Sequence, residues 1–68
     1  MIKVRRLNEE EFVINCDLIE TVENTPDTVI TLVNGHKYIV KEDVDTIIQK
    51  VKTFKRDIAK IVDGRNGV

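Results

Sequence analysis

A short turn signal between two strand-like segments shapes this chain more than any other part of its sequence. The segments are residues 28–33, TVITLV, and residues 36–40, HKYIV, and β-branched or aromatic side chains dominate both. Between them lie Asn34 and Gly35, two residue types that tolerate the positive φ angles of a type I′ turn. The sequence therefore predicts an antiparallel hairpin over residues 28–40.

A two-residue loop also predicts which residues face each other across this hairpin. Counting outward from the turn pairs Ile30 with Ile39 and Thr31 with Tyr38. Side chains alternate between the two faces of a sheet, so each face receives its own set. One set is Ile30, Leu32 and Ile39, and the other is Val29, Thr31, Tyr38 and Val40. Both faces thus carry apolar side chains, although a single helix can cover only one of them.

The residues before this hairpin predict three further short strands. Residues 2–5 alternate apolar and basic side chains, and residues 12–14 are apolar after a polar break at residues 8–11. Residues 18–23 form the third candidate, and the turn that follows them contains proline and aspartate. About five short strands joined by tight turns predict a small antiparallel β-meander within residues 2–41.

After residue 41 the apolar pattern changes from a period of two to a period of seven. The heptad positions a and d hold Val44, Ile47, Val51, Phe54, Ile58 and Ile61. Asp43 is a good N-cap for the first turn, and Gly64 is a typical stop. We expect one long C-terminal amphipathic helix over about residues 43–62 and a frayed tail over residues 64–68. The predicted fold class is α+β, in one domain that spans residues 1–68.

The predicted helix is longer than the sheet that it would cover. The 19 residues from Val44 to Val62 span about 28 Å, whereas strands of five or six residues span about 17–20 Å. The last turns of the helix should therefore overhang the sheet and expose Phe54, Ile58 and Ile61.

A chain of this size needs support beyond its own small core. Its single cysteine, Cys16, excludes an internal disulfide, and its single histidine, His36, leaves too few ligands for a structural zinc site. We therefore expect self-association or a protein partner. The predicted contact surface consists of Tyr38, Phe54, Ile58 and Ile61. Two alternatives stay open, namely core packing of these side chains and a sheet that curls into a partial barrel with the helix lying diagonally across it.

The composition argues against catalysis. The chain has no Ser-His-Asp set, no Cys/His cluster and no glycine-rich phosphate loop. The acidic run at residues 9–11 is expected to be solvated, Cys16 to pack as a small apolar residue, and His36 to border a surface turn. We therefore expect no enzyme activity, no cofactor, no metal and no small-molecule substrate.

Charge is distributed unevenly along the chain, whose net charge is −1. Residues 1–42 hold five basic and eight acidic side chains, whereas residues 43–62 hold five basic and three acidic ones. The helix lysines scatter over several non-core positions, and few aromatic side chains could stack on bases, so nucleic acid is not an expected partner. The chain has neither a secretory signal pattern nor about 18 consecutive apolar residues, so we expect a cytoplasmic protein that does not span the membrane.

Several short motifs resemble those of the small flagellar proteins of the FlbD family, also called swarming motility proteins. The motifs are RLN at residues 6–8, FVIN at 12–15, DLIE at 17–20, TPDT at 25–28, NG at 34–35, KY at 37–38 and VK at 40–41. The resemblance covers roughly residues 2–55. Members of the family commonly have glycine after the asparagine of the first hairpin, where this chain has Glu9, so a first turn that is wider or of another type is expected.

The resemblance implies a non-enzymatic, cytoplasmic accessory protein of flagellar and swarming motility. Such a protein would act through protein contacts on motor output or flagellar assembly, at the cytoplasmic face of the flagellar base. Its partners would be further copies of itself, as a homo-oligomer, and/or a flagellar motor or export protein. The order strand, strand, Asn-Gly turn, strand and helix also resembles, more weakly, the LytTR type of DNA-binding domain, which is longer and more basic on its reading loops. A small nucleic-acid-binding regulatory module is therefore the alternative function.

Overall fold

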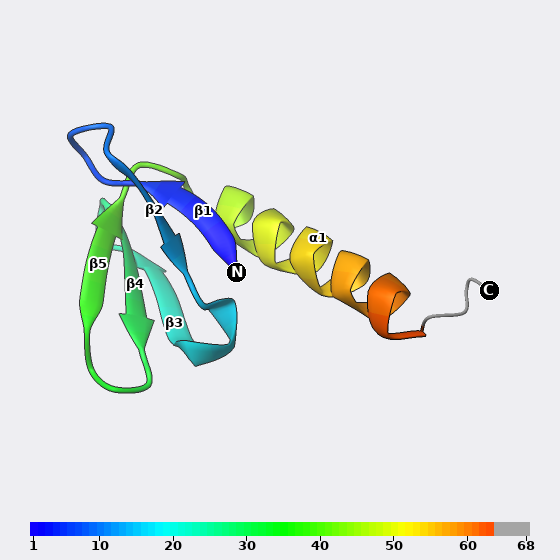
Figure 1. Cartoon of the computed structure of the whole chain (residues 1–68). Coiled ribbons are helices and arrows are strands. Elements are labelled where there is room, and N and C mark those ends of the chain that lie inside the picture. The colour runs from blue at the N-terminus through cyan, green and yellow to red at the C-terminus, as the bar shows by residue number, and fades with distance from the viewer. Residues whose placement is uncertain (64–68) are drawn as a thin grey trace.

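The computed structural model describes the backbone of residues 1–63 and the surroundings of side chains up to residue 60. The predicted stop at Gly64 and the predicted frayed tail, residues 64–68, lie outside the described residues. The elements follow the order β1 (Ile2–Arg5), β2 (Glu11–Ile14), η1 (Cys16–Leu18), β3 (Ile19–Asn24), β4 (Thr28–Leu32), β5 (Lys37–Val40) and α1 (Val44–Asp63). Within the described residues, five antiparallel strands followed by one long helix confirm the predicted α+β class (Figure 1).

The strands form two sheets instead of the single meander that the sequence predicts. β1 pairs with β2, while β3, β4 and β5 form a separate three-stranded antiparallel sheet. The short 3-10 helix η1 separates the two sheets along the chain. Asn15 caps η1, because its side-chain oxygen accepts a hydrogen bond from the backbone N–H of Asp17 at 3.0 Å. This local bond favours a turn over a continued strand, so β2 and β3 do not pair.

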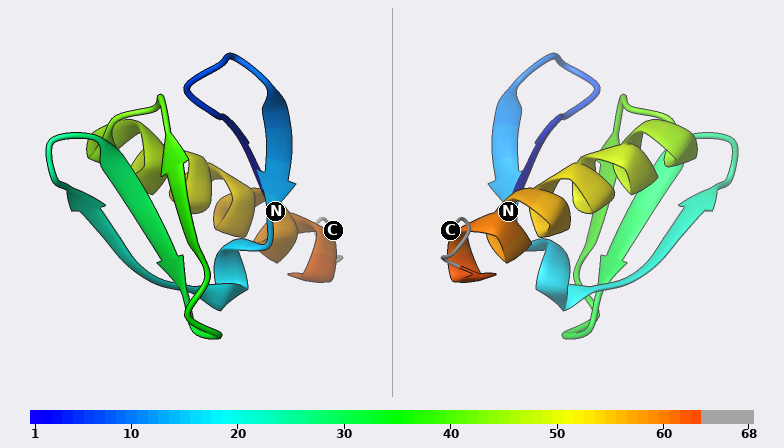
Figure 2. Two further views of the ribbon diagram at one scale, coloured as in Figure 1. Left: turned by 90° about the vertical axis from the view of Figure 1, so that its left-hand side faces the viewer. Right: turned by 90° about the vertical axis from the view of Figure 1, so that its right-hand side faces the viewer.

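The hydrophobic core lies where the two sheets and the helix meet (Figure 2). The two sheets stand at an angle to each other, and α1 crosses both on one side. The buried side chains are Ile2, Val4, Ile14 and Cys16 from the first part of the chain, Ile30, Leu32 and Val40 from the second sheet, and Ile47 from α1. The core position of Cys16 confirms the prediction for that residue. Because neither sheet is large enough to be stable alone, the shared core holds all three parts together.

The turn between β4 and β5 has three residues instead of the predicted two. The backbone N–H of Leu32 donates to the carbonyl of His36 at 2.8 Å, and the N–H of Gly35 donates to the carbonyl of Leu32 at 2.9 Å. The loop therefore consists of residues 33–35, in which Gly35 alone has a positive φ, 90°. This geometry is that of a three-residue hairpin loop ending in a left-handed residue.

The longer loop shifts the pairing of β5 by one residue from the predicted register. Ile30 faces Tyr38, and Val29 faces Ile39. A shift of one residue exchanges the two faces of a strand. Tyr38 therefore packs against the core, while Ile39 lies with Val29 on the outer side, where Ile39 is 46% exposed. The predicted position of Tyr38 on an uncovered sheet face is wrong.

The first hairpin closes with the same kind of turn. The N–H of Arg6 donates to the carbonyl of Glu10 at 2.8 Å, and the N–H of Glu9 donates to the carbonyl of Arg6 at 2.9 Å. Glu9 occupies the position that Gly35 holds in the second hairpin, and its φ is 74°. The first turn is therefore one residue wider than a two-residue loop, as expected, although Glu9 adopts the left-handed conformation in spite of its side chain.

The helix α1 begins and packs as the sequence predicts. The carboxylate of Asp43 accepts a hydrogen bond from the N–H of Thr46 at 2.8 Å, as an N-cap does. Along the predicted apolar stripe, Ile47 is 1% exposed, Phe54 is partly buried and Ile58 is 40% exposed. The last turns of α1 extend past both sheets (Figure 1). The predicted overhang of the helix is therefore confirmed. The predicted exposure of Phe54 is wrong, because its side chain packs against the core.

Replacing Gly35 by alanine tests the three-residue turn. A Cβ at this position would meet no atom within 4 Å, so the cost comes from the left-handed backbone alone. We expect Gly35→Ala to lower the free energy of unfolding by about 1–2 kcal/mol in a urea titration. The control His36→Ala, at an exposed neighbouring position, should change it by less than about 0.5 kcal/mol. Equal effects of the two changes would contradict the turn geometry.

Candidate interaction surface

The four residues predicted to form an interaction surface do not lie together. Tyr38 is on β5, at the opposite end of the molecule from the last turns of α1 (Figure 1). Phe54 is partly buried against the core and also lines an open hollow between β1 and α1. Ile61 belongs to α1, but its side chain lies outside the described residues. Of the three whose side chains are described, Ile58 alone is exposed.

Tyr38 belongs to a small cluster that joins the two sheets. Its ring centroid lies 5.4 Å from that of Phe12 on β2, with 45° between the ring planes. The guanidinium carbon of Arg6 lies 4.2 Å from the centroid of Phe12 and 5.9 Å from that of Tyr38. Arg6 is held in this position by Glu10, whose carboxylate accepts a hydrogen bond from Nε at 3.0 Å. Aromatic pairs contribute about 0.5–1.5 kcal/mol beyond burial, so the structure supports core packing for Tyr38.

A network of charged side chains fixes the start of α1 on the first hairpin. The carboxylate of Glu42, whose side chain is 8% exposed, accepts hydrogen bonds from the backbone N–H of Arg5 at 3.0 Å and from its Nε at 3.2 Å. Arg5 also pairs with Glu9 at 3.2 Å, and Glu9 pairs with Lys41. The backbone N–H of Lys41 donates to the carbonyl of Arg5 at 2.9 Å. The connection from β5 to α1 is therefore bound to β1 through both backbone and side chains.

These contacts keep the acidic groups of the network charged. Burial raises the pKa of the Glu42 carboxyl, but hydrogen bonds from Arg5 and from the backbone outweigh it, so that pKa lies below its ordinary value. The hydrogen bond from Lys41 lowers the pKa of Glu9. The hydrogen bond to Glu42 raises the pKa of Arg5. At neutral pH the network therefore consists of two carboxylates and two cations.

A second ion pair joins the helix to η1. Nζ of Lys55 lies 2.9 Å from Oδ1 of Asp17. Their hydrogen bond lowers the pKa of Asp17 and raises that of Lys55. Both side chains are more than half exposed, so water and salt screen the pair. Its contribution to stability is therefore small.

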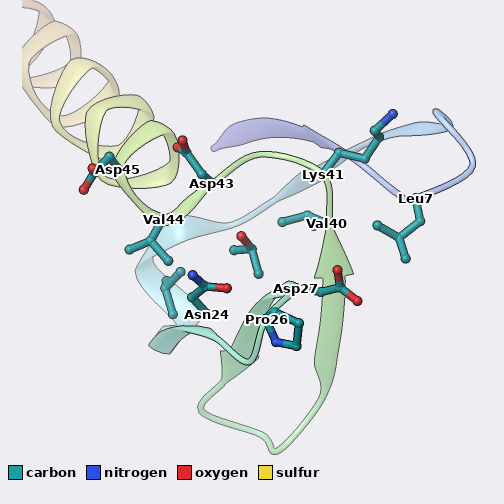
Figure 3. A pocket seen from close by; sticks show the side chains of 11 residues that line it. Leu7, Asn24, Pro26, Asp27, Val40, Lys41, Asp43, Val44 and Asp45 are labelled. Atoms are coloured by element: carbon teal, nitrogen blue, oxygen red, sulfur yellow. The ribbon is translucent and has the colours of Figure 1, made fainter.

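An open groove of about 850 Å³ lies beside the start of α1 (Figure 3). Its apolar lining includes Val22 of β3, Val40 of β5 and Val44 of α1. Its acidic lining consists of Asp27, Asp43 and Asp45, and we call it the aspartate groove. The other lining residues are Leu7, Asn24, Pro26, Thr28 and Lys41. Sequence reasoning missed this groove because its aspartates come from two separate turns and the helix, and only the fold brings them to one place.

The described part of the chain contains no group of three or more His, Cys, Asp or Glu side chains that could hold a metal ion. Within residues 1–63, no helix combines the length and the apolar character needed to cross a membrane.

The fold and its surfaces define a small α+β module in which a helix projects from a compact pair of sheets. The family model of FlbD, described as flagellar and swarming motility proteins, matches residues 1–59. No curated protein and no solved structure matches the chain. The chain therefore belongs to the FlbD family, which is not a known family of enzymes, and it has a role in flagellar or swarming motility.

The buried carboxylate of Glu42 leads to a prediction about stability and pH. Its folded pKa lies below the ordinary value of 4.5, so its stabilising effect is present above that pH and is lost as the pH falls through the folded pKa. We expect Glu42→Gln to lower the free energy of unfolding by about 1–2 kcal/mol near neutral pH, and by progressively less in acid. Urea titrations at several pH values measure both effects.

A matched control for this change is Glu23→Gln, at an exposed position of β3. It should alter the free energy of unfolding by less than about 0.5 kcal/mol at every pH. A loss for Glu42→Gln that is the same in acid as at neutral pH would show that the charge of Glu42 does not hold the start of α1.

Proposed function

We propose that this chain is a non-enzymatic accessory protein of flagellar motility that acts through protein contacts made by the projecting end of α1. It acts on motor output or on flagellar assembly, at the cytoplasmic face of the flagellar base. Membership of the FlbD family supports the role in flagellar motility. The projecting end of α1 supports action through contact with another protein.

This proposal rests on one observation, which is that the side chains along one apolar stripe of α1 become more exposed toward its end. Ile47, Phe54 and Ile58 share this stripe, because they are spaced by seven and four residues on a helix. Exposure rises along it from 1% at Ile47 to 40% at Ile58. An apolar stripe that continues beyond the core that it serves is typical of a helix that binds another protein.

Nucleic acid is the less favoured partner. Phe12 and Tyr38 pack against each other and against Arg6, so they do not form a free platform on which bases could stack. Residues 1–42 also carry three more acidic than basic side chains, which disfavours contact with phosphates. Both observations favour a protein surface as the partner.

Replacing Ile58 by glutamate in the host tests the proposed contact. Ile58 is 40% exposed and glutamate is a good helix former, so the fold should be kept, as circular dichroism and thermal unfolding can verify. We expect swarming to fall to the level seen when the gene is deleted. The matched control Ile39→Glu, at a 46% exposed position on the edge strand β5, should swarm normally. Normal swarming of the Ile58→Glu strain would contradict the proposal.

Two further measurements on the same strains distinguish an effect on motor output from an effect on flagellar assembly. Filaments are counted by microscopy, and the rotation of single flagella is measured under load. Normal filament numbers with reduced torque support an effect on the motor, whereas missing filaments support an effect on assembly. Binding of the purified chain to DNA that falls steeply with added salt would favour a nucleic-acid partner instead.

A further inference from the structure

The groove at the start of α1 is suited to a ligand that is both apolar and basic. Its lining combines several valines with the side chains of Asp27, Asp43 and Asp45. The lining includes a single cation, Lys41, and the ammonium group of Lys41 pairs with Glu9. The aspartate groove therefore keeps a negative charge next to an apolar surface, and such a surface attracts a partner of the opposite charge.

The other end of the same helix has the composition that the groove requires. Ile58 is 40% exposed there, and Lys52 and Lys60 are exposed as well, whereas Lys55 pairs with Asp17. Residues 52–60 hold four basic side chains and one acidic one. The two ends of α1 are thus complementary in charge, and each presents apolar side chains.

Two antiparallel copies of α1 would bring each basic end to the groove of the other copy. Asp45 and Ile58 lie 13 positions apart on one helix, or about 20 Å. A two-fold axis near the middle of the paired helices therefore lets both contacts form together.

We propose that the aspartate groove binds residues 52–60 of a second copy of this chain, in a two-fold symmetric dimer in which each copy fills the groove of the other. Ile58 enters the apolar lining, and Lys52 and Lys60 face the aspartates. The reciprocal contact closes the assembly at two copies. This inference deepens the proposed function and rests on it in one respect, since both assign the projecting end of α1 as a contact surface.

Charge-reversal variants test this pairing. The groove variant carries Asp27→Lys and Asp45→Lys, and the helix variant carries Lys52→Glu and Lys60→Glu. All four side chains are exposed, and the capping bond of Asp43 is left intact, so both variants should fold, as circular dichroism can verify. Analytical ultracentrifugation over a range of protein concentrations measures the dissociation constant of each protein and of an equimolar mixture.

The unaltered chain should form a dimer that weakens as sodium chloride is added. Each variant alone should dimerise at least about tenfold more weakly, because like charges then meet in both contacts. The mixture should regain nearly the original affinity, because groove lysines then meet helix glutamates. The control pair Glu20→Lys and Glu23→Lys, at exposed positions of β3 outside the groove, should leave the dimer unchanged.

A chain that stays monomeric at every concentration would overturn the inference. So would a dimer that neither variant weakens, or one that mixing does not restore. If the chain is monomeric and the Ile58→Glu strain still fails to swarm, another protein binds the projecting end of α1, and the proposed function stands without the dimer. If the dimer forms as described and the Ile58→Glu strain swarms normally, the dimer stands and the proposed function falls.

Discussion

The rest of this structure depends on one buried contact, the insertion of Ile47 between two sheets that are too small to stand alone. Ile47 is 1% exposed and shares a single apolar cluster with Val4 of the first hairpin and Ile30 of the second sheet. Sheets of two and three strands bury too little apolar surface to be stable unless a further element covers them. The first half of α1 provides that cover, so the chain folds as one unit around it.

The direction of α1 is set by the contacts that fix its first turn beside β1. Asp43 caps the first turn, and the nearly buried carboxylate of Glu42 is bonded to both the backbone and the guanidinium of Arg5. With its start fixed on β1 and Ile47 in the core, the 20-residue helix runs beyond the sheets. The exposure of Ile58 is therefore a consequence of helix length. In the function that we propose, this exposed side chain is the point of contact with another protein.

Local chemistry decided which parts of this fold could be predicted from the sequence. The helix was predictable because its cap and its apolar stripe are local signals. The hairpin register was not, because an Asn-Gly pair suits both a two-residue and a three-residue loop. The two hairpin turns have an asparagine in common. The side chains of Asn8 and Asn34 each accept a hydrogen bond of 3.0 Å from the backbone N–H two residues later. The position of Tyr38 and the aspartate groove escaped prediction because the first depends on that register and the second on contacts between distant segments.

The division of α1 into a core half and a free half can be measured by making the same change at two points of one stripe. Ile47→Ala and Ile58→Ala each remove the same atoms, and urea titration at low protein concentration gives the free energy of unfolding of both variants. We predict a loss of about 2–4 kcal/mol for Ile47→Ala and of less than about 0.5 kcal/mol for Ile58→Ala. Equal losses at the two positions would contradict a helix that is half core and half free surface.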